Sequence, residues 1–221
     1  MNQSKPLLLL ILMLLPLSLI SQENEDYIEF NDRKNVVHGV YAGVTTYIGK
    51  INGKNTYIMG FKLAYVANRK LEIGFAGGAL YSRNYLSEHV NENSDLLGGY
   101  GGIHIEPIIF GKSKVSIGFP LFLGFGGAGF AKDDYKEASR NGDPQFEDWD
   151  SFFLVEPGVN LLYNLSRYVQ LEAGVKYRIS TEIELNPGYI KSINGFSAGV
   201  GVKIGIFNMG RNRYKKSINE E

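Results

Sequence analysis

Titratable side chains recur at alternate positions of several short segments of this 221-residue sequence. They are Lys62, Glu72, His104, Glu106, Glu156, Glu172, Lys176, Arg178 and Lys203. Carboxylates, amines and imidazoles could transfer protons or bind a metal ion, or they could neutralise one another as ion pairs. Four glutamates stand against four cations, and buried charges persist in proteins where they are paired. We therefore interpret the set as a structural polar network and expect no catalytic, cofactor-binding or metal-binding residue in it.

The segments that carry these charges alternate apolar residues with small or polar ones, which is the period-two pattern of a strand. In GFSAGVGVKIGIF, for example, the even positions are almost all apolar, and the odd positions before Phe207 are glycines, one serine and Lys203. Eight segments have this pattern, each near the ~9–11 residues that a tilted membrane strand needs. They are residues 36–49, 56–66, 71–81, 101–109, 115–131, 153–163, 169–179 and 195–207.

The connections between these segments alternate in length. NRK, GKSK and NLSR read as tight turns, whereas SRNYLSEHVNENSD, KDDYKEASRNGDPQFEDWD and TEIELNPGYIKSI are long and polar. Sequential strands with short turns at one end and long loops at the other form an up-and-down meander. We therefore predict an all-β fold: an eight-stranded antiparallel up-and-down transmembrane β-barrel, with short periplasmic turns and longer extracellular loops.

The apolar face of each strand is expected to contact lipid, and the small or charged face is expected to line the interior. The interior of an eight-stranded barrel is narrow and just filled by side chains, which gives the many glycines a steric reason. We expect Lys203 to reach a carboxylate, with Glu172 on the preceding strand as the first candidate. A hairpin turn at residues 165–166 would set Glu156 nearly opposite Lys176.

Aromatic residues near the strand ends predict two girdles at the membrane interfaces. The residues by the loops are Tyr47, Tyr57, Tyr81, Phe153 and Phe196, and those by the turns are Tyr65, Phe110, Tyr163, Tyr168 and Phe207.

The first 21 residues have the layout of a secretory signal peptide: one positive charge, a short apolar core and small residues, with cleavage expected near Ser21/Gln22. Residues 22–35 then form an N-terminal periplasmic segment, 36–207 the β-barrel domain and 208–221 a polar C-terminal tail. Cysteine is absent, which excludes disulfides, thiolate metal sites and a lipid-anchored cysteine. Lys and Arg total 23 against 23 Asp and Glu, so nothing indicates a nucleic-acid partner.

The alternating strands, the alternating connections and the export signal resemble the small outer-membrane β-barrel proteins. The pattern is similar to the eight-stranded transmembrane domain of OmpA, and in particular to the exported barrel-domain proteins of Bacteroidetes, over about residues 36–207. The resemblance implies a place in the outer membrane of a Gram-negative bacterium. It also implies that the last strand, closing on Phe207, is recognised by the barrel assembly machinery, although this chain continues through NMGRNRYKKSINEE.

Three further patterns are better explained without chemistry. Gly124, Gly126 and Gly129 match G-x-G-x-x-G, but the polar residues that follow do not predict the helix that a dinucleotide site needs. The acidic loop lacks the spacing of an EF-hand, so we interpret it as a solvated extracellular loop. It contains Asp133, Asp134, Glu137, Asp143, Glu147, Asp148 and Asp150. His89, beside Ser87 and Glu88, is the one candidate for a catalytic pair at the extracellular rim.

We therefore expect an integral outer-membrane barrel with a structural or interaction role, not an enzyme, and with no cofactor. The expected partners are outer-membrane lipid and lipopolysaccharide, the barrel assembly machinery and a surface or periplasmic protein. Three alternatives stay open: a small channel or transport barrel, a rim enzyme, and a soluble secreted ligand-binding β-barrel. A soluble barrel of that kind would show a wide cavity lined by apolar residues.

Overall fold

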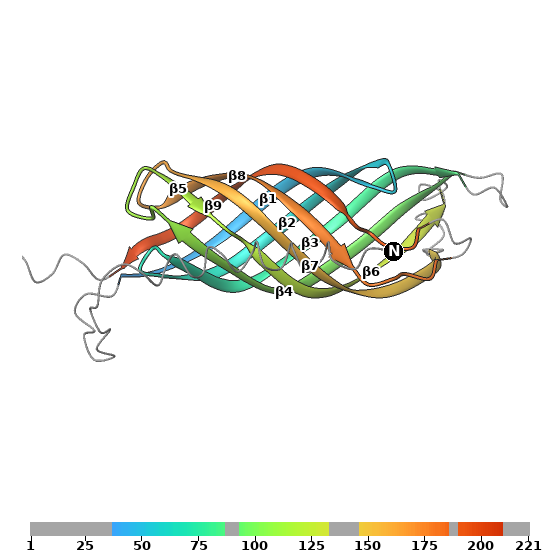
Figure 1. Cartoon of the computed structure of the whole chain (residues 1–221), viewed down its shortest axis with the longest axis horizontal. Coiled ribbons are helices and arrows are strands. Elements are labelled where there is room, and N and C mark those ends of the chain that lie inside the picture. Colours follow the sequence, from blue (N-terminus) through green and yellow to red (C-terminus); the bar gives the residue numbers. More distant parts are fainter. Residues whose placement is uncertain (1–36, 87–92, 133–145, 186–189, 210–221) are drawn as a thin grey trace, which may run out of the picture. The chain divides into compact units, whose positions relative to one another are not determined.

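The structure, a computed structural model, describes residues 37–86, 93–132, 146–185 and 190–209. These residues lie in one compact unit of the chain, Val36–Glu221. They form antiparallel strands (Figure 1), and none of them belongs to a helix long and apolar enough to cross a bilayer. The strands are β1 (His38–Ile51), β2 (Lys54–Ala67), β3 (Leu71–Leu86), β4 (Asn93–Ile109), β5 (Val115–Gly118), β6 (Leu121–Lys132), β7 (Phe146–Asn164), β8 (Val169–Ser180) and β9 (Gly195–Met209).

The sheet returns on itself, because β9 pairs with both β8 and β1. From β1 the pairing runs through β2, β3 and β4 to β6, and then through β7 and β8 to β9. Each strand therefore has a hydrogen-bonded neighbour on both sides, which leaves no exposed edge among these strands. We call the end with the turns around residues 68–70, 110–114 and 165–168 the turn end (left in Figure 1), and the opposite end the loop end. The predicted all-β antiparallel meander is confirmed.

The segment 115–131, predicted as one strand, is two strands, β5 and β6. Both pair with β4 and β7, and the register of β5 against these neighbours continues unchanged into β6. Pro120 causes the break because it has no N–H to donate to the ladder. The neighbouring backbone groups still bond across the gap, Phe119 N to Pro107 O at 2.9 Å and Gly158 N to Pro120 O at 2.8 Å. The nine described strands thus fill eight positions around the sheet.

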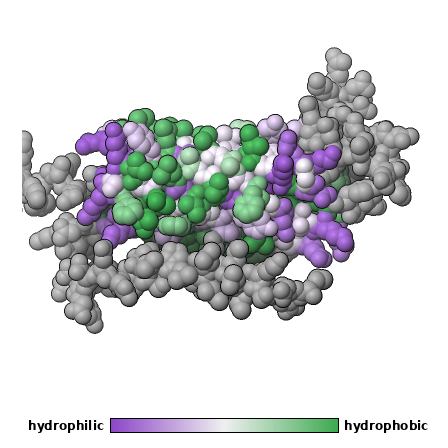
Figure 2. Space-filling view, turned by 45° about the horizontal axis from the view of Figure 1, so that its top comes forward, coloured by the Kyte–Doolittle hydropathy of each residue, from purple (hydrophilic) through white to green (hydrophobic). Residues whose placement is uncertain are grey.

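The two faces of the strands differ as the period-two pattern predicts. Outward apolar side chains are widely exposed, with Phe196 at 73% and Met59 at 72%, whereas Lys203 is fully buried on the inward face. Figure 2 shows hydrophobic residues gathered over the middle of the strands, with hydrophilic residues toward both ends. Such a band is what the hydrocarbon core of a bilayer requires of a barrel surface.

The predicted aromatic girdles need two corrections. Tyr57, Phe153 and Phe196 near the loops are exposed, as are Tyr65, Phe110 and Tyr168 near the turns. Tyr47 and Phe207, in contrast, point inward and are only 3% and 7% exposed. Their position in the alternation explains this, since Phe207 lies four residues after the inward Lys203 and Tyr47 lies two after the inward Thr45. Phe207 stacks on the buried ring of Tyr41, with ring centroids 5.7 Å apart.

The connection between β8 and β9 was predicted to be a polar loop, but its described residues place apolar side chains in the interior. Ile183, Leu185, Ile190 and Ile193 are buried in a cluster with side chains of the strands at the loop end. Two hydrogen bonds hold the segment in place: Ile183 N donates to Lys191 O at 3.0 Å, and Glu184 N donates to the Asp150 carboxylate at 2.7 Å. Within the described residues, these side chains therefore form a buried apolar cluster at the loop end, which we call the apolar seal.

Candidate functional site

A buried ion-pair network crosses the middle of the barrel. The Lys203 ammonium on β9 lies 2.8 Å from Glu72, 3.3 Å from Glu106 and 3.4 Å from Glu172. All four side chains are almost completely excluded from solvent. Glu172, the partner expected from the sequence, is within reach, but Glu72 on β3 is closer. Lys203 therefore joins three strands, of which only β8 is its hydrogen-bonded neighbour.

A second lysine pairs with two of the same carboxylates. The Lys62 ammonium donates to both oxygens of Glu172, at 2.8 and 2.7 Å, and lies 3.9 Å from Glu106. Neutral groups satisfy further oxygens: the Tyr41 hydroxyl donates to Glu72 at 2.5 Å, and the Asn160 amide donates to Glu106 at 2.8 Å. Burying this many charges is costly unless each is paired and hydrogen-bonded, and the network supplies partners to these three carboxylates except at one oxygen, Glu72 Oε1.

His104 lies between two of the carboxylates. Its Nε2 atom is 3.2 Å from Glu106 and 3.9 Å from Glu72, and the register places Glu72 directly opposite Glu106 on the neighbouring strand. These three side chains offer atoms within 4.8 Å of one another, a spacing compatible with a metal ion. The Lys203 ammonium already contacts both carboxylates, however, and so supplies positive charge of the kind that a metal ion would bring. We interpret the cluster as part of the ion-pair network.

Glycines make room for these long side chains. A Cβ atom on Gly118 would lie 2.1 Å from a carboxylate oxygen of Glu106. A Cβ atom on Gly201 would lie 2.8 Å from Glu172 and from Thr45. Both contacts are shorter than van der Waals packing allows, which supports the steric reason expected for glycine on the inward face.

A second polar layer lies nearer the loop end. The Arg178 Nε atom donates to Glu156 at 2.8 Å, and the guanidinium lies 5.9 Å from the ring centroid of Tyr100. The sequence placed Glu156 nearly opposite Lys176. The register instead pairs Gly158 with Lys176, and Glu156 therefore lies opposite Arg178, two residues further along β8. The turn between β7 and β8 is longer than the two residues assumed, because β8 begins at Val169. The Lys176 ammonium instead lies over the Tyr47 ring, 4.3 Å from its centroid.

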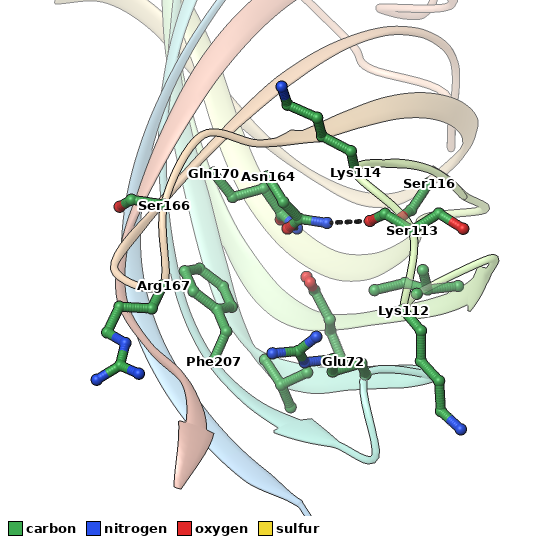
Figure 3. A pocket seen from close by; sticks show the side chains of 14 residues that line it. Glu72, Lys112, Ser113, Lys114, Ser116, Asn164, Ser166, Arg167, Gln170 and Phe207 are labelled. Carbon is green, nitrogen blue, oxygen red and sulfur yellow. Dashed lines mark hydrogen bonds between the residues drawn. The ribbon is translucent and has the colours of Figure 1, made fainter.

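Two cavities lie beside these polar layers. A cavity of about 20 Å³ beside Lys62, Glu156 and Arg178 has room for roughly one water molecule. A larger cavity, about 360 Å³, lies at the turn end and reaches inward to Glu72 (Figure 3). Within the described residues, the ion-pair network and the apolar seal stand between this cavity and the loop end.

The other patterns singled out in the sequence do not form a site. Gly124, Gly126 and Gly129 lie in strand β6, so the helix of a dinucleotide site is absent at this position. The rim pair around His89 and most of the acidic loop lie outside the described residues, as does the signal peptide. Of the loop acids, Asp150 lies in β7 and accepts hydrogen bonds from the backbone of Ser151 and Glu184, each at 2.7 Å.

No family model and no curated protein matches this chain. Among solved structures, the crystal structure of Neisserial surface protein A (NspA) matches with a TM-score of 0.50 and 17% identity, covering 76% of this chain and 96% of that one. The crystal structure of Ail, the attachment invasion locus protein of Yersinia pestis, matches with a TM-score of 0.46 and 16% identity, covering 77% and 99%. These neighbours are eight-stranded outer-membrane barrels, and at this identity the likeness to NspA establishes the fold.

Proposed function

We propose that the chain is an integral outer-membrane β-barrel whose role is structural or an interaction role, without catalysis. The observation that carries the proposal is the reversal of the usual polarity: the charges lie inside in ion pairs, and the apolar side chains lie outside. Phe196 and Met59 are among many large outward side chains that stay largely exposed in the described part of the chain. A continuous apolar band of this kind needs lipid or a partner surface.

The same observation argues against a soluble carrier and against a channel. A soluble barrel that binds a ligand would hold a wide apolar cavity, whereas the middle of this interior is filled by Lys62, Lys203, Arg178 and their carboxylates. A channel needs a continuous polar path, which the apolar seal around Ile193 interrupts. Interactions of the protein with its partners are then expected at its two ends and on its lipid-facing surface.

The proposal includes the finer expectations from the sequence. Residues 1–21 direct export, the barrel resembles the transmembrane domain of OmpA and the barrel proteins of Bacteroidetes, and its last strand is inserted by the assembly machinery. Outer-membrane lipid and lipopolysaccharide surround the apolar band. A surface protein would engage the long loops, and a periplasmic protein would engage the turns.

Cell fractionation with gel electrophoresis tests the proposal. We expect the protein in the outer-membrane fraction, and we expect unboiled samples to migrate differently from boiled ones because a closed barrel resists SDS. A protein found in the soluble periplasmic fraction, with no effect of boiling on migration, would refute it.

A further inference from the structure

The cavity at the turn end has the size of a small-ligand site. Its volume of about 360 Å³ lies near the lower limit of pockets that bind small molecules, which measure about 300–1,000 Å³. All three turns contribute to it, as do side chains from inside the barrel. Val66, Ile108 and Phe207 form its apolar wall. Of the ion-pair network described above, Glu72 lines the cavity.

The mouth of the cavity is cationic. Arg69, Lys112, Lys114 and Arg167 are among the residues that line the cavity, and the turn sequences 68–70, 110–114 and 165–168 contain no aspartate or glutamate. Lys114 and Arg167 lie over the rings of Tyr163 and Tyr168, 5.6 and 5.9 Å from the centroids. Figure 3 shows Lys112 and Arg167 on opposite sides of the cavity, with the Glu72 carboxylate between them. An anionic group is therefore favoured at the mouth.

The inner part of the cavity has the opposite character. Glu72 and Gln170 line it, and each has one buried oxygen, Oε1, without a hydrogen-bond partner. The other oxygen of Glu72 is used by Tyr41 and Lys203. A chain of hydrogen bonds fixes the amide of Gln170, because Asn164 Nδ2 donates to Ser113 O at 2.9 Å and Asn164 Oδ1 then accepts from Gln170 Nε2 at 2.8 Å. Buried acceptors in this state need a donor.

We propose that the cavity binds a small amphoteric molecule, one that carries a primary ammonium group and a phosphate or carboxylate group on a short aliphatic chain. The ammonium group points inward and donates to Glu72 and Gln170, and the anion remains at the mouth with Arg69 and Lys112. A simple anion would leave the inner acceptors unpaired, and a simple amine would be repelled by the cationic turns. This assignment goes beyond the proposed function, and it predicts the orientation as well as the class of the ligand.

Two sources could supply this chemistry: a free amphoteric compound, or the ethanolamine phosphate head group of a phospholipid. Purified protein in a nonionic detergent is titrated calorimetrically with O-phosphoethanolamine, ethanolamine and ethyl phosphate. We expect O-phosphoethanolamine to bind at least about tenfold more tightly than either of the other two, since it alone pairs both ends. If phosphatidylethanolamine in mixed micelles displaces O-phosphoethanolamine and phosphatidylcholine does not, the lipid head group is the ligand. If neither lipid competes, the ligand is the free compound.

Two variants test the two ends of the ligand separately, and a third is the control. R69Q/K112Q should lower the affinity for O-phosphoethanolamine by about tenfold or more, because charge-assisted contacts to the anion are lost. Q170M should weaken O-phosphoethanolamine but leave ethyl phosphate unchanged. K191Q removes a charge at the loop end and should change the affinity for neither O-phosphoethanolamine nor ethyl phosphate. Equal affinity for the three compounds, or an equal loss in K191Q, would overturn the assignment. Gel migration of the same samples with and without boiling shows whether the barrel is folded, independently of ligand binding.

Discussion

The Lys203 ammonium lies 2.8 Å from the Glu72 carboxylate, although the two residues are 131 positions apart and their strands, β9 and β3, are separated in the sheet by β1 and β2. The contact therefore spans the interior and does not follow a neighbouring pair of strands. It connects two parts of the wall through a side chain that no water reaches.

Replacing Lys203 should destabilise the barrel strongly. K203M keeps the length of the side chain but leaves Glu72, Glu106 and Glu172 with too few cations, and removing one member of a buried ion pair costs about 3–5 kcal/mol. The free energy of unfolding in urea, measured in lipid vesicles, reports the loss. K50M removes an exposed lysine of β1 and serves as the control, with an expected change within about 0.5 kcal/mol. Equal effects of the two substitutions would contradict the network.

The pair of Lys62 and Glu172 should show coupling. K62M and E172L each leave a buried charge without its nearest partner, whereas the double variant removes both charges. We expect the double variant to be more stable than the sum of the single losses predicts, by about 0.5–3 kcal/mol. A double-mutant cycle on urea unfolding measures this energy, and strict additivity would show that the two groups do not interact.

Much of this interior follows from the sequence, because the period of two assigns each strand residue to one face. That period puts Lys203 and Glu172 inside and Phe196 outside. It also places Phe207 inside, but the aromatic side chain of Phe207 led to its assignment to the outer girdle. Contacts such as the one from Lys203 to Glu72 join strands that are not neighbours, and their relative height depends on the shear of the whole barrel.

Two further features lay beyond the sequence pattern. The partner of Glu156 depends on the exact length of one turn, and an error of one or two residues moves the pairing from Arg178 to Lys176. The seal at the loop end depends on Ile183, Leu185, Ile190 and Ile193, whose spacing is irregular. These apolar residues in a nominally polar loop were the available signal, but irregular segments have no period from which a buried face can be assigned.

The apolar seal should contribute to stability. I193A removes a fully buried side chain from the cluster at the loop end, and substitutions of this type in a packed core cost about 2–5 kcal/mol. Urea unfolding in vesicles measures the change. I48A, on the exposed outer face, should cost less, because no protein cavity is created there. A larger loss for I48A than for I193A would show that the loop segment does not pack into the barrel.

The filled interior predicts an electrically silent protein. Planar-bilayer recordings of the full chain should show no steady open-pore conductance, because the ion-pair network and the seal leave no continuous water path. Stable conductance steps that disappear when the protein is omitted would favour a channel and contradict the proposed structural role.

The claim that the outward apolar face meets lipid is tested most directly at Val200, in the middle of β9 and 56% exposed. An arginine near the bilayer midplane on the lipid face of a barrel costs about 2–4 kcal/mol, whereas an exposed position of a water-soluble protein tolerates it within about 0.5 kcal/mol. We expect V200R to lower the free energy of unfolding in phospholipid vesicles by the larger amount. A change within about 0.5 kcal/mol would contradict a membrane-embedded barrel.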